Sequence, residues 1–332
     1  MRDLPSDIET DAVVDALTDG WGFDADSIEY AAVGAGSYHW IAADAGGARR
    51  FVTVDDLDQK RWLGETRDAA RDALGRAFDT AVALRQAGLD FVVAPIPTSG
   101  GESLRRIGER HTVAVFPFVD GEGGCWGPYE PGARAAVVSM LAELHQATPV
   151  GFVRTVGLEL TGRRVLEAAL REVNETWSGG PLSEPARQAF SNHADDMPAF
   201  LALASRLAAA VEQRGPAMVV THGEPHAANV LRTDEGHVLV DWDTVALGPR
   251  ERDLWWLGDE PGDLAAYAAL TGHEVDAEAV AFFRLAWDLN DVAVYLGVLR
   301  LPHVESEDTL DAYAGVTRCM PSRERWLDWT TG

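Results

Sequence analysis

The sequence predicts an α+β chain of two lobes, a small N-terminal lobe built on an antiparallel sheet and a larger, mostly helical C-terminal lobe. In the first 119 residues, short β-prone runs alternate with glycine turns, whereas helical periodicity dominates from residue 132 onward. The stretch between them, residues 119–131, is rich in glycine and proline and is typical of a linker. We therefore expect lobes at residues 1–119 and 120–332.

The N-terminal lobe is expected to hold five strands and one main helix. Strands are predicted at residues 30–33, 38–43, 50–54, 91–93 and 112–116. Alanine and leucine recur at helical spacing over residues 66–88, and Gly88 supplies the C-terminal stop. A shorter helix is predicted over residues 7–19 and a turn over residues 99–103.

The C-terminal lobe is predicted to be helical apart from one pair of strands. Helices are expected at residues 132–146, 162–177, 185–195, 198–214, 264–270, 277–299 and 309–317. The strands, residues 218–220 and 238–240, are expected to bracket a loop as a pair.

Composition excludes several classes of protein. The net charge of −25 disfavours nucleic acid as a partner and favours a cationic one, with plain solubility as the alternative. No apolar run is long enough for a membrane span, and the acidic N-terminus lacks the features of a signal peptide. A cytoplasmic location with no membrane partner is therefore expected. Cys125 and Cys319 lack metal-site spacing and are predicted to be reduced thiols.

One segment carries the residues that phosphoryl transfer requires. Glu224 lies on a tight Gly-Glu-Pro loop after an apolar strand, and Asn229 follows five residues later. Asp241 comes at the end of the next strand, where it could meet the same ion as the Asn229 amide oxygen. Such a set can orient an attacking hydroxyl and hold Mg²⁺ on phosphates, the alternative being polar loop residues without a role.

The spacing of this segment resembles that of the aminoglycoside phosphotransferase and choline kinase superfamily. There the loop reads His-Gly-Asp, four residues, Asn, and the next strand ends in Asp, followed by Gly, four residues and Asp-Leu. The matching tail here runs from Gly248 to Leu254. The resemblance implies a protein-kinase-like two-lobe fold, Mg²⁺ as cofactor, and ATP or GTP as co-substrate.

The resemblance also implies roles for individual residues. Glu224 is expected to be the catalytic base, with Asn229 and Asp241 as metal ligands. His222 is a further catalytic candidate, although bracing of the loop is the favoured role. Asp253 is expected to cap or tie the helix that follows it. Asp243 is expected to form a turn, with support of the metal ligands from behind as the alternative.

The nucleotide would be held by the N-terminal lobe. Backbone groups of Phe116 and Phe118 fall where the family's hinge strand binds the base. Gly34, Gly36 and Ser37 fall where its turn covers the phosphates, with a plain hairpin turn as the alternative.

The acceptor region is predicted on a late helix. Asp288 and Asp291 share one face, and Trp287 lies beside Asp291 at helical spacing. Acids and an aromatic ring on one face suit an ammonium-bearing substrate, and a solvated face is the alternative.

Two positions depart from the family pattern. Glu224 replaces the usual Asp, and Thr53 stands where the third strand supplies a phosphate-binding lysine. One alternative is that Lys60, the only lysine of the chain, reaches the phosphates from seven residues downstream of Thr53. Arg49 or Arg50 acting instead, or no cation at all, are the others. Asp72 and Asp79 are candidates for the partner acid of this cation.

The sequence thus predicts a small-molecule kinase that phosphorylates a hydroxyl of a small, cationic acceptor. An aminoglycoside-like antibiotic, with resistance as the outcome, and an amino sugar are both compatible with it. The departures at Thr53 and Glu224 motivate an alternative, a pseudokinase-like protein that binds a nucleotide or metabolite without transfer. The sequence leaves the acceptor, the choice of ATP or GTP and the oligomeric state open.

Overall fold

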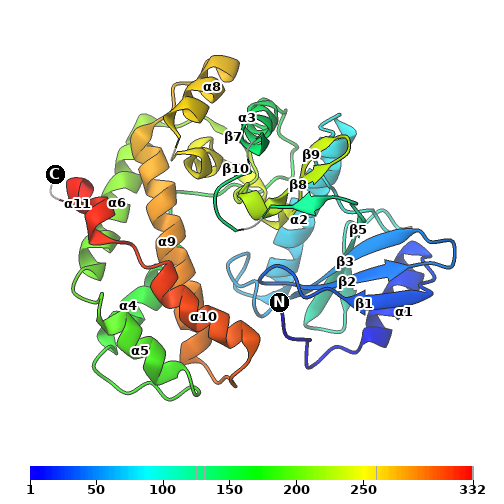
Figure 1. Cartoon of the computed structure of the whole chain (residues 1–332), viewed down its shortest axis with the longest axis horizontal. Helices are drawn as coiled ribbons and strands as arrows, with labels where there is room; N and C mark the ends of the chain where they lie inside the picture. The colour runs from blue at the N-terminus through cyan, green and yellow to red at the C-terminus, as the bar shows by residue number, and fades with distance from the viewer. Residues whose placement is uncertain (125, 131, 259, 331–332) are drawn as a thin grey trace. The chain divides into compact units, whose positions relative to one another are not determined.

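The computed structural model describes residues 1–124, 126–130, 132–258 and 260–330, so Cys125 and Pro131 lie outside the described residues. The chain divides into two compact units (Figure 1). One consists of Met1–Val156 and Ala217–Glu274, the other of Gly157–Pro216 and Val275–Gly332. The lobe boundary at residue 119 stays a prediction. Over the described part of the chain, no helix is long and apolar enough to cross a membrane.

The first unit begins with the expected antiparallel sheet. Its strands follow the order β1-β2-β3-β5-β4. Their bounds are β1 (Ser27–Tyr30), β2 (Tyr38–Ala43), β3 (Arg49–Asp56), β4 (Arg105–Ile107) and β5 (His111–Pro117), accompanied by helices α1 (Thr10–Trp21) and α2 (Arg67–Gln86). The strand predicted at residues 91–93 is wrong, because Val92 forms only an isolated bridge to Leu239. Pro95 and Pro97 follow directly and lack the N–H groups that a strand needs.

Alternating residues of β5 bury the two faces of this sheet. Val113 and Val115 pack in the cluster that contains Val13 and Leu17 of α1. Ala114 and Phe116 pack instead with Leu74 and Phe78 of α2. Thr53 of β3 is paired with Ala114, so Thr53 and Asp55, two residues further on, lie on the α2 face of the sheet.

The rest of the first unit consists of short strands and helices around the motif segment. They are β6 (Glu122–Gly123), α3 (Ala133–Leu144), β7 (Met218–Thr221), η1 (Ala227–Asn229), β8 (Val230–Thr233), β9 (Gly236–Leu239), η2 (Trp242–Thr244), β10 (Ala246–Pro249), α7 (Glu251–Leu254), η3 (Trp255–Leu257) and α8 (Pro261–Thr271). The predicted pairing of residues 218–220 with 238–240 is wrong. β7 pairs with β10, while β9 pairs with β8 across a tight turn that ends at Gly236.

The second unit is entirely helical among its described residues. It contains α4 (Arg163–Arg171), α5 (Ser183–Ser191), α6 (Met197–Arg214), α9 (Ala277–Arg300), α10 (Glu307–Arg318) and α11 (Arg323–Thr330). One apolar core joins these helices, with Leu166, Phe190, Phe200 and Phe282 almost completely buried in it. Asp276 caps α9 by accepting hydrogen bonds from the backbone of Glu278 and Ala279. The antiparallel sheet and the helices thus give the expected α+β architecture.

Candidate active site

The buried carboxylate of Asp253 holds the backbone of the loop after β7. Asp253 accepts hydrogen bonds from the backbone N–H of His222 (2.8 Å) and of Gly223 (2.6 Å), and its side chain contacts His145 Nε2 at 3.0 Å. Burial alone would raise the pKa of Asp253, but the hydrogen bond from His145 and nearby positive charges lower it below its usual value. Of the two predicted roles, the capping one is wrong, because Asp253 lies within α7 (Glu251–Leu254) and makes no cap; its side chain instead ties this helix to the loop.

Glycine is required at position 223. Its φ of 103° lies in the left-handed region, and a Cβ there would collide with the guanidinium group of Arg252. Arg252 in turn donates hydrogen bonds to Thr221 Oγ1 (2.7 Å) and to the carbonyl of Thr244 (2.9 Å). The backbone on both sides of the loop is thereby fixed.

His222 is completely buried and braces this loop. It accepts a hydrogen bond from the backbone N–H of Glu224 at Nδ1 (3.2 Å), and its Nε2 donates to the carbonyl of Val240 (2.9 Å). Burial lowers the pKa of His222 to about 4, so the imidazole is neutral near pH 7. Because both ring nitrogens are engaged, the geometry favours the bracing role over proton transfer.

Glu224 and Asn229 lie on the same short loop, joined by one hydrogen bond. The Asn229 amide nitrogen donates to the carbonyl of Glu224 (2.9 Å) and contacts His226 Nε2 (3.3 Å). With its nitrogen used in this way, the amide oxygen is the atom that could bind a metal ion. The Glu224 side chain is 29% exposed, which leaves its carboxylate accessible to a substrate.

Asp241 has a backbone conformation that residues other than glycine rarely adopt. Its φ of 66° is the only positive value among the described non-glycine residues. Surrounding protein atoms raise the pKa of Asp241 well above its usual range, and the carboxylates of Asp243 and Glu224 raise it further. The residue nevertheless keeps exposed surface. Crowded carboxylates of this kind fit a divalent cation, which would relieve their repulsion.

The protein alone supplies few metal ligands here. Within the described ranges, no group of three or more His, Cys, Asp or Glu residues is arranged to hold a metal ion. An amide and a carboxylate match the way Mg²⁺ is usually bound in phosphate-transfer sites, with water and phosphate oxygens completing the shell.

Lys60 reaches this acidic group from the N-terminal sheet. Its ammonium lies 2.7 Å from Asp243 Oδ2 and 3.1 Å from Asp55 Oδ1, and the residue is only 4% exposed. Burial alone would lower the pKa of Lys60, but Asp243 and Asp55 raise it above its usual value, so the ammonium is charged. Of the alternatives that the sequence left open, Lys60 is the one that reaches this group of acids, and its contact with nucleotide phosphates stays a prediction.

The other basic candidates point elsewhere. Arg49 lies over the ring of Phe118 at 3.9 Å and pairs with Asp120, while Arg50 lies over the ring of Phe23. The predicted partner acids on α2 are also wrong. Asp72 and Asp79 are exposed on α2, and Lys60 pairs with Asp55 of β3 and Asp243 of η2 instead. The predicted turn former Asp243 is thus also part of the site.

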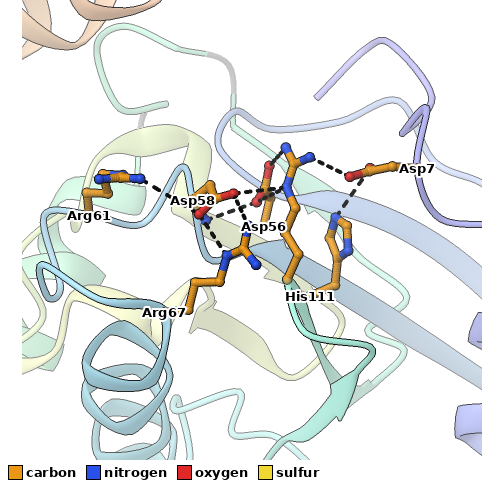
Figure 2. Close-up of polar contacts among 7 residues, drawn as sticks. Asp7, Asp56, Asp58, Arg61, Arg67 and His111 are labelled. Atoms are coloured by element: carbon orange, nitrogen blue, oxygen red, sulfur yellow. Dashed lines mark hydrogen bonds and ion pairs between the residues drawn. The ribbon is translucent and has the colours of Figure 1, made fainter.

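A network of ion pairs fixes the loop that carries Lys60 (Figure 2). Arg110 binds Asp56 through two nitrogens, at 2.8 and 2.5 Å. Arg67, the first residue of α2, binds Asp58 in the same bidentate way, at 2.9 and 2.6 Å. These two pairs, which we call the loop clamp, hold the chain just before Lys60 on both sides.

The glycine turn before β2 is connected to Asp55, the partner of Lys60. Gly34 and Gly36 have φ values of 68° and 84°, which explains why the turn uses glycine. Ser37 donates a hydrogen bond of 2.7 Å to the Asp55 oxygen that also pairs with Lys60. Thr53 contacts His39 Nδ1 at 3.2 Å on the same face of the sheet.

The remaining predicted residues lie in two places. Phe116 belongs to the β5 ladder and is buried, and Phe118 follows it with Arg49 on its ring. Their binding of the base stays a prediction.

Trp287, Asp288 and Asp291 lie on α9 in the second unit, all partly buried rather than fully solvated. Burial raises the pKa of Asp288 to about 7, and Asp291 adds to this increase. Asp291 itself accepts a contact of 3.4 Å from Cys319, a free thiol. Their part in binding the acceptor stays a prediction.

Comparison with known proteins agrees with this arrangement. The model of the phosphotransferase enzyme family matches residues 39–288. Protein StrN from Streptomyces griseus is 27% identical over 272 residues, which cover 78% of this chain and 81% of that protein.

Solved structures share the fold over nearly the whole chain. Spectinomycin phosphotransferase, in complex with ADP and spectinomycin, aligns with a TM-score of 0.74 at 17% identity, over 98% of this chain and 99% of that one. A microcompartment-associated aminopropanol kinase aligns with a TM-score of 0.61 at 16% identity, over 97% and 98%. An amicoumacin kinase bound to AMP-PNP, Ca²⁺ and its ligand aligns with a TM-score of 0.57 at 12% identity, over 96% and 97%.

Proposed function

The chain belongs to the phosphotransferase enzyme family, and from this membership we propose that it transfers the γ-phosphoryl group of ATP or GTP to a hydroxyl of a small cationic acceptor. The contact of Lys60 with Asp55 and Asp243 is the observation that carries the proposal. This contact supports an active enzyme, because Lys60 supplies the positive charge that Thr53 cannot supply.

In the proposed mechanism, Lys60 contacts the phosphates of the bound nucleotide. Asn229 and Asp241 would hold Mg²⁺, which would neutralise negative charge on the phosphates of the bound nucleotide. Glu224 accepts or orients the proton of the acceptor hydroxyl, so that its oxygen attacks the γ-phosphorus in line with the leaving group. Gly34, Gly36 and Ser37 cover the phosphates, and the backbone of Phe116 and Phe118 holds the base.

The acceptor is proposed to carry an amine. The net charge of −25 favours a cation, and Asp288, Asp291 and Trp287 provide acids and an aromatic ring on one helix. Spectinomycin, which is bound in one of the similar structures, and aminopropanol, after which another of these kinases is named, are amines as well. An aminoglycoside-like antibiotic and an amino sugar remain the two acceptor classes, and no nucleic acid or membrane partner is proposed.

Thermal shift with Mg-ATP and Mg-GTP tests the nucleotide half of the proposal. A ligand present at about 100 times its Kd adds about 2.7 kcal/mol to the free energy of unfolding, which gives a readily measured rise in Tm. No rise with either nucleotide would contradict a triphosphate site. A rise without phosphoryl transfer to any of a broad set of amino alcohols would favour the inactive alternative, for which Glu224 in place of Asp remains the argument.

A further inference from the structure

Three aromatic rings gather beside the catalytic loop. The ring of His226 lies 4.3 Å from that of Trp126 and 5.1 Å from that of Trp256, between their centroids, and the two tryptophans are 6.1 Å apart. Trp256 is backed by Trp255 at 3.9 Å. We call Trp126, His226 and Trp256 the aromatic wall.

The wall is attached to the catalytic loop itself. His226 Nε2 lies 3.8 Å from the Glu224 carboxylate, and Trp256 Nε1 donates to the carbonyl of Gly223 at 3.4 Å. Trp126 comes from the segment after β6, which presses on the same loop. A Cβ at Gly124 would collide with the carbonyl of Ala227. The wall is therefore packed against the loop that carries Glu224.

Two features of the wall differ from ordinary core packing. Trp126 is 58% exposed, although tryptophan is the largest apolar side chain and this one packs on His226. His226 is 7% exposed, and its Nδ1 has no hydrogen-bond partner among the described residues. The Asn229 amide nitrogen lies 3.3 Å from Nε2, so Nδ1 is the ring nitrogen that a bound ligand could contact.

We propose that the aromatic wall binds the ring of the acceptor and so selects ring-bearing amines, amino sugars or aminocyclitols, over acyclic amino alcohols. This inference rests on the proposed function. The C–H face of a saturated ring packs flat against indole, and an ammonium on that ring is attracted to the same π-face. His226 connects the wall to the catalytic carboxylate, because its ring packs on Trp126 and its Nε2 lies 3.8 Å from Glu224. A hydroxyl on a ring that packs on the wall therefore lies close to Glu224.

Substitution of Trp126 tests the proposal, since an exposed side chain can be removed without opening the core. We compare Trp126→Ala and Trp126→Phe, with Leu270→Ala, 57% exposed on α8 of the same unit, as the control. The probes are glucosamine and spectinomycin as ring-bearing amines and 1-amino-2-propanol as the acyclic one. Their Kd values are measured by calorimetry in the presence of Mg-AMP-PNP.

Trp126→Ala is expected to raise the Kd of at least one ring-bearing amine about 10-fold and Trp126→Phe by less, with the acyclic amine and the nucleotide unaffected. Leu270→Ala should change none of these values. Equal weakening of ring-bearing and acyclic amines, no effect of Trp126→Ala, or no binding of either ring-bearing amine to the unaltered protein would overturn the proposal. Retained binding of Mg-AMP-PNP in those cases separates failure of the wall from failure of the kinase proposal.

Discussion

The ammonium of Lys60 lies between one carboxylate from β3 and one from η2. In the family pattern the phosphate lysine projects from the third strand itself, at the position of Thr53. Here β3 continues to Asp55, which lies on the same face as Thr53. The loop after the strand then turns back, so that the Lys60 ammonium contacts the Asp55 carboxylate. The positive charge on the α2 face of the sheet thus comes from Lys60 in the loop after β3, and not from a residue of the strand itself.

Removal of the Lys60 ammonium should weaken both catalysis and stability. Lys60→Met leaves Asp55 and Asp243 without a cation, and loss of one partner of a buried ion pair costs about 3–5 kcal/mol in the free energy of unfolding. In protein that remains folded, we expect kcat/KM for the nucleotide to fall about 100-fold. Arg61→Met, with an exposed side chain next in sequence, is the control.

Moving the lysine back to the strand provides a test that is independent of stability. The double variant Thr53→Lys with Lys60→Met restores a cation on the same face, and we expect it to recover part of the lost kcat/KM. If Lys60→Met folds and turns over nucleotide at the normal rate, the assignment of Lys60 is wrong.

At the scale of elements, the loop clamp connects the start of α2 and the turn before β5 to the loop that carries Lys60. Leu57, which lies between the two clamp acids, is 1% exposed, and its backbone N–H donates to the carbonyl of Arg110 at 2.9 Å. The loop is therefore fixed by backbone and side-chain contacts together. Such a loop can place an ammonium reproducibly in spite of its distance from the strand.

Loss of half of the clamp should affect nucleotide binding more than chemistry. Arg67→Met removes both hydrogen bonds to Asp58, so the loop gains freedom and the KM for ATP should rise several-fold, with a smaller change in kcat. Steady-state kinetics measures the two effects separately. Arg71→Met, on the same helix, should leave both values unchanged; a fall in kcat alone would argue against a positioning role.

Helix α9 carries a carboxyl group with an altered pKa. Because burial raises the pKa of Asp288 from 3.8 to about 7, the folded state holds its proton more tightly than the unfolded state. Its contribution to stability is therefore present below about pH 4 and is lost as the pH rises towards 7. Asp288→Asn should raise Tm at pH 8 but not at pH 4, as measured by calorimetry. A similar change in Tm at both values would contradict the altered pKa.

At the scale of the whole molecule, the net charge of −25 should act on association. An acidic surface attracts cationic acceptors. Salt weakens this attraction, because the screening length is about 10 Å at 0.1 M ionic strength. We expect the KM of an amine acceptor to rise between low and high salt, while its kcat changes little. Kinetics over a salt series checks this, and an unchanged KM would remove the role of the charge.

Much of the fold could be predicted from local patterns. The β-prone runs and glycine turns predicted the meander of β2 and β3, and alanine and leucine periodicity predicted α2 within two residues at each end. Pairing between distant segments could not be predicted in the same way. The partner of β7 is β10, a strand of Ala-Leu-Gly-Pro that has little β propensity and depends on its tertiary context.

The same distinction applies to the site. Glu224, Asn229 and Asp241 follow a spacing that the sequence displays directly. The contacts of Lys60 with Asp243 and of Asp253 with the loop join residues far apart in the chain, so spacing alone does not reveal them. One signal was available for Lys60: a single lysine in an arginine-rich chain, close behind the strand that lacks one.

The most direct test of the account is transfer of labelled γ-phosphate from Mg-ATP to amine-bearing acceptors by the unaltered protein and by Glu224→Gln. The substitution keeps the size of the side chain but removes the carboxylate that receives the proton. We expect labelled product from the unaltered protein, and from Glu224→Gln a rate lower by about 100-fold or more with nucleotide binding retained. Equal rates for the two proteins, or no labelled product from either in spite of nucleotide binding, would contradict the proposed kinase site.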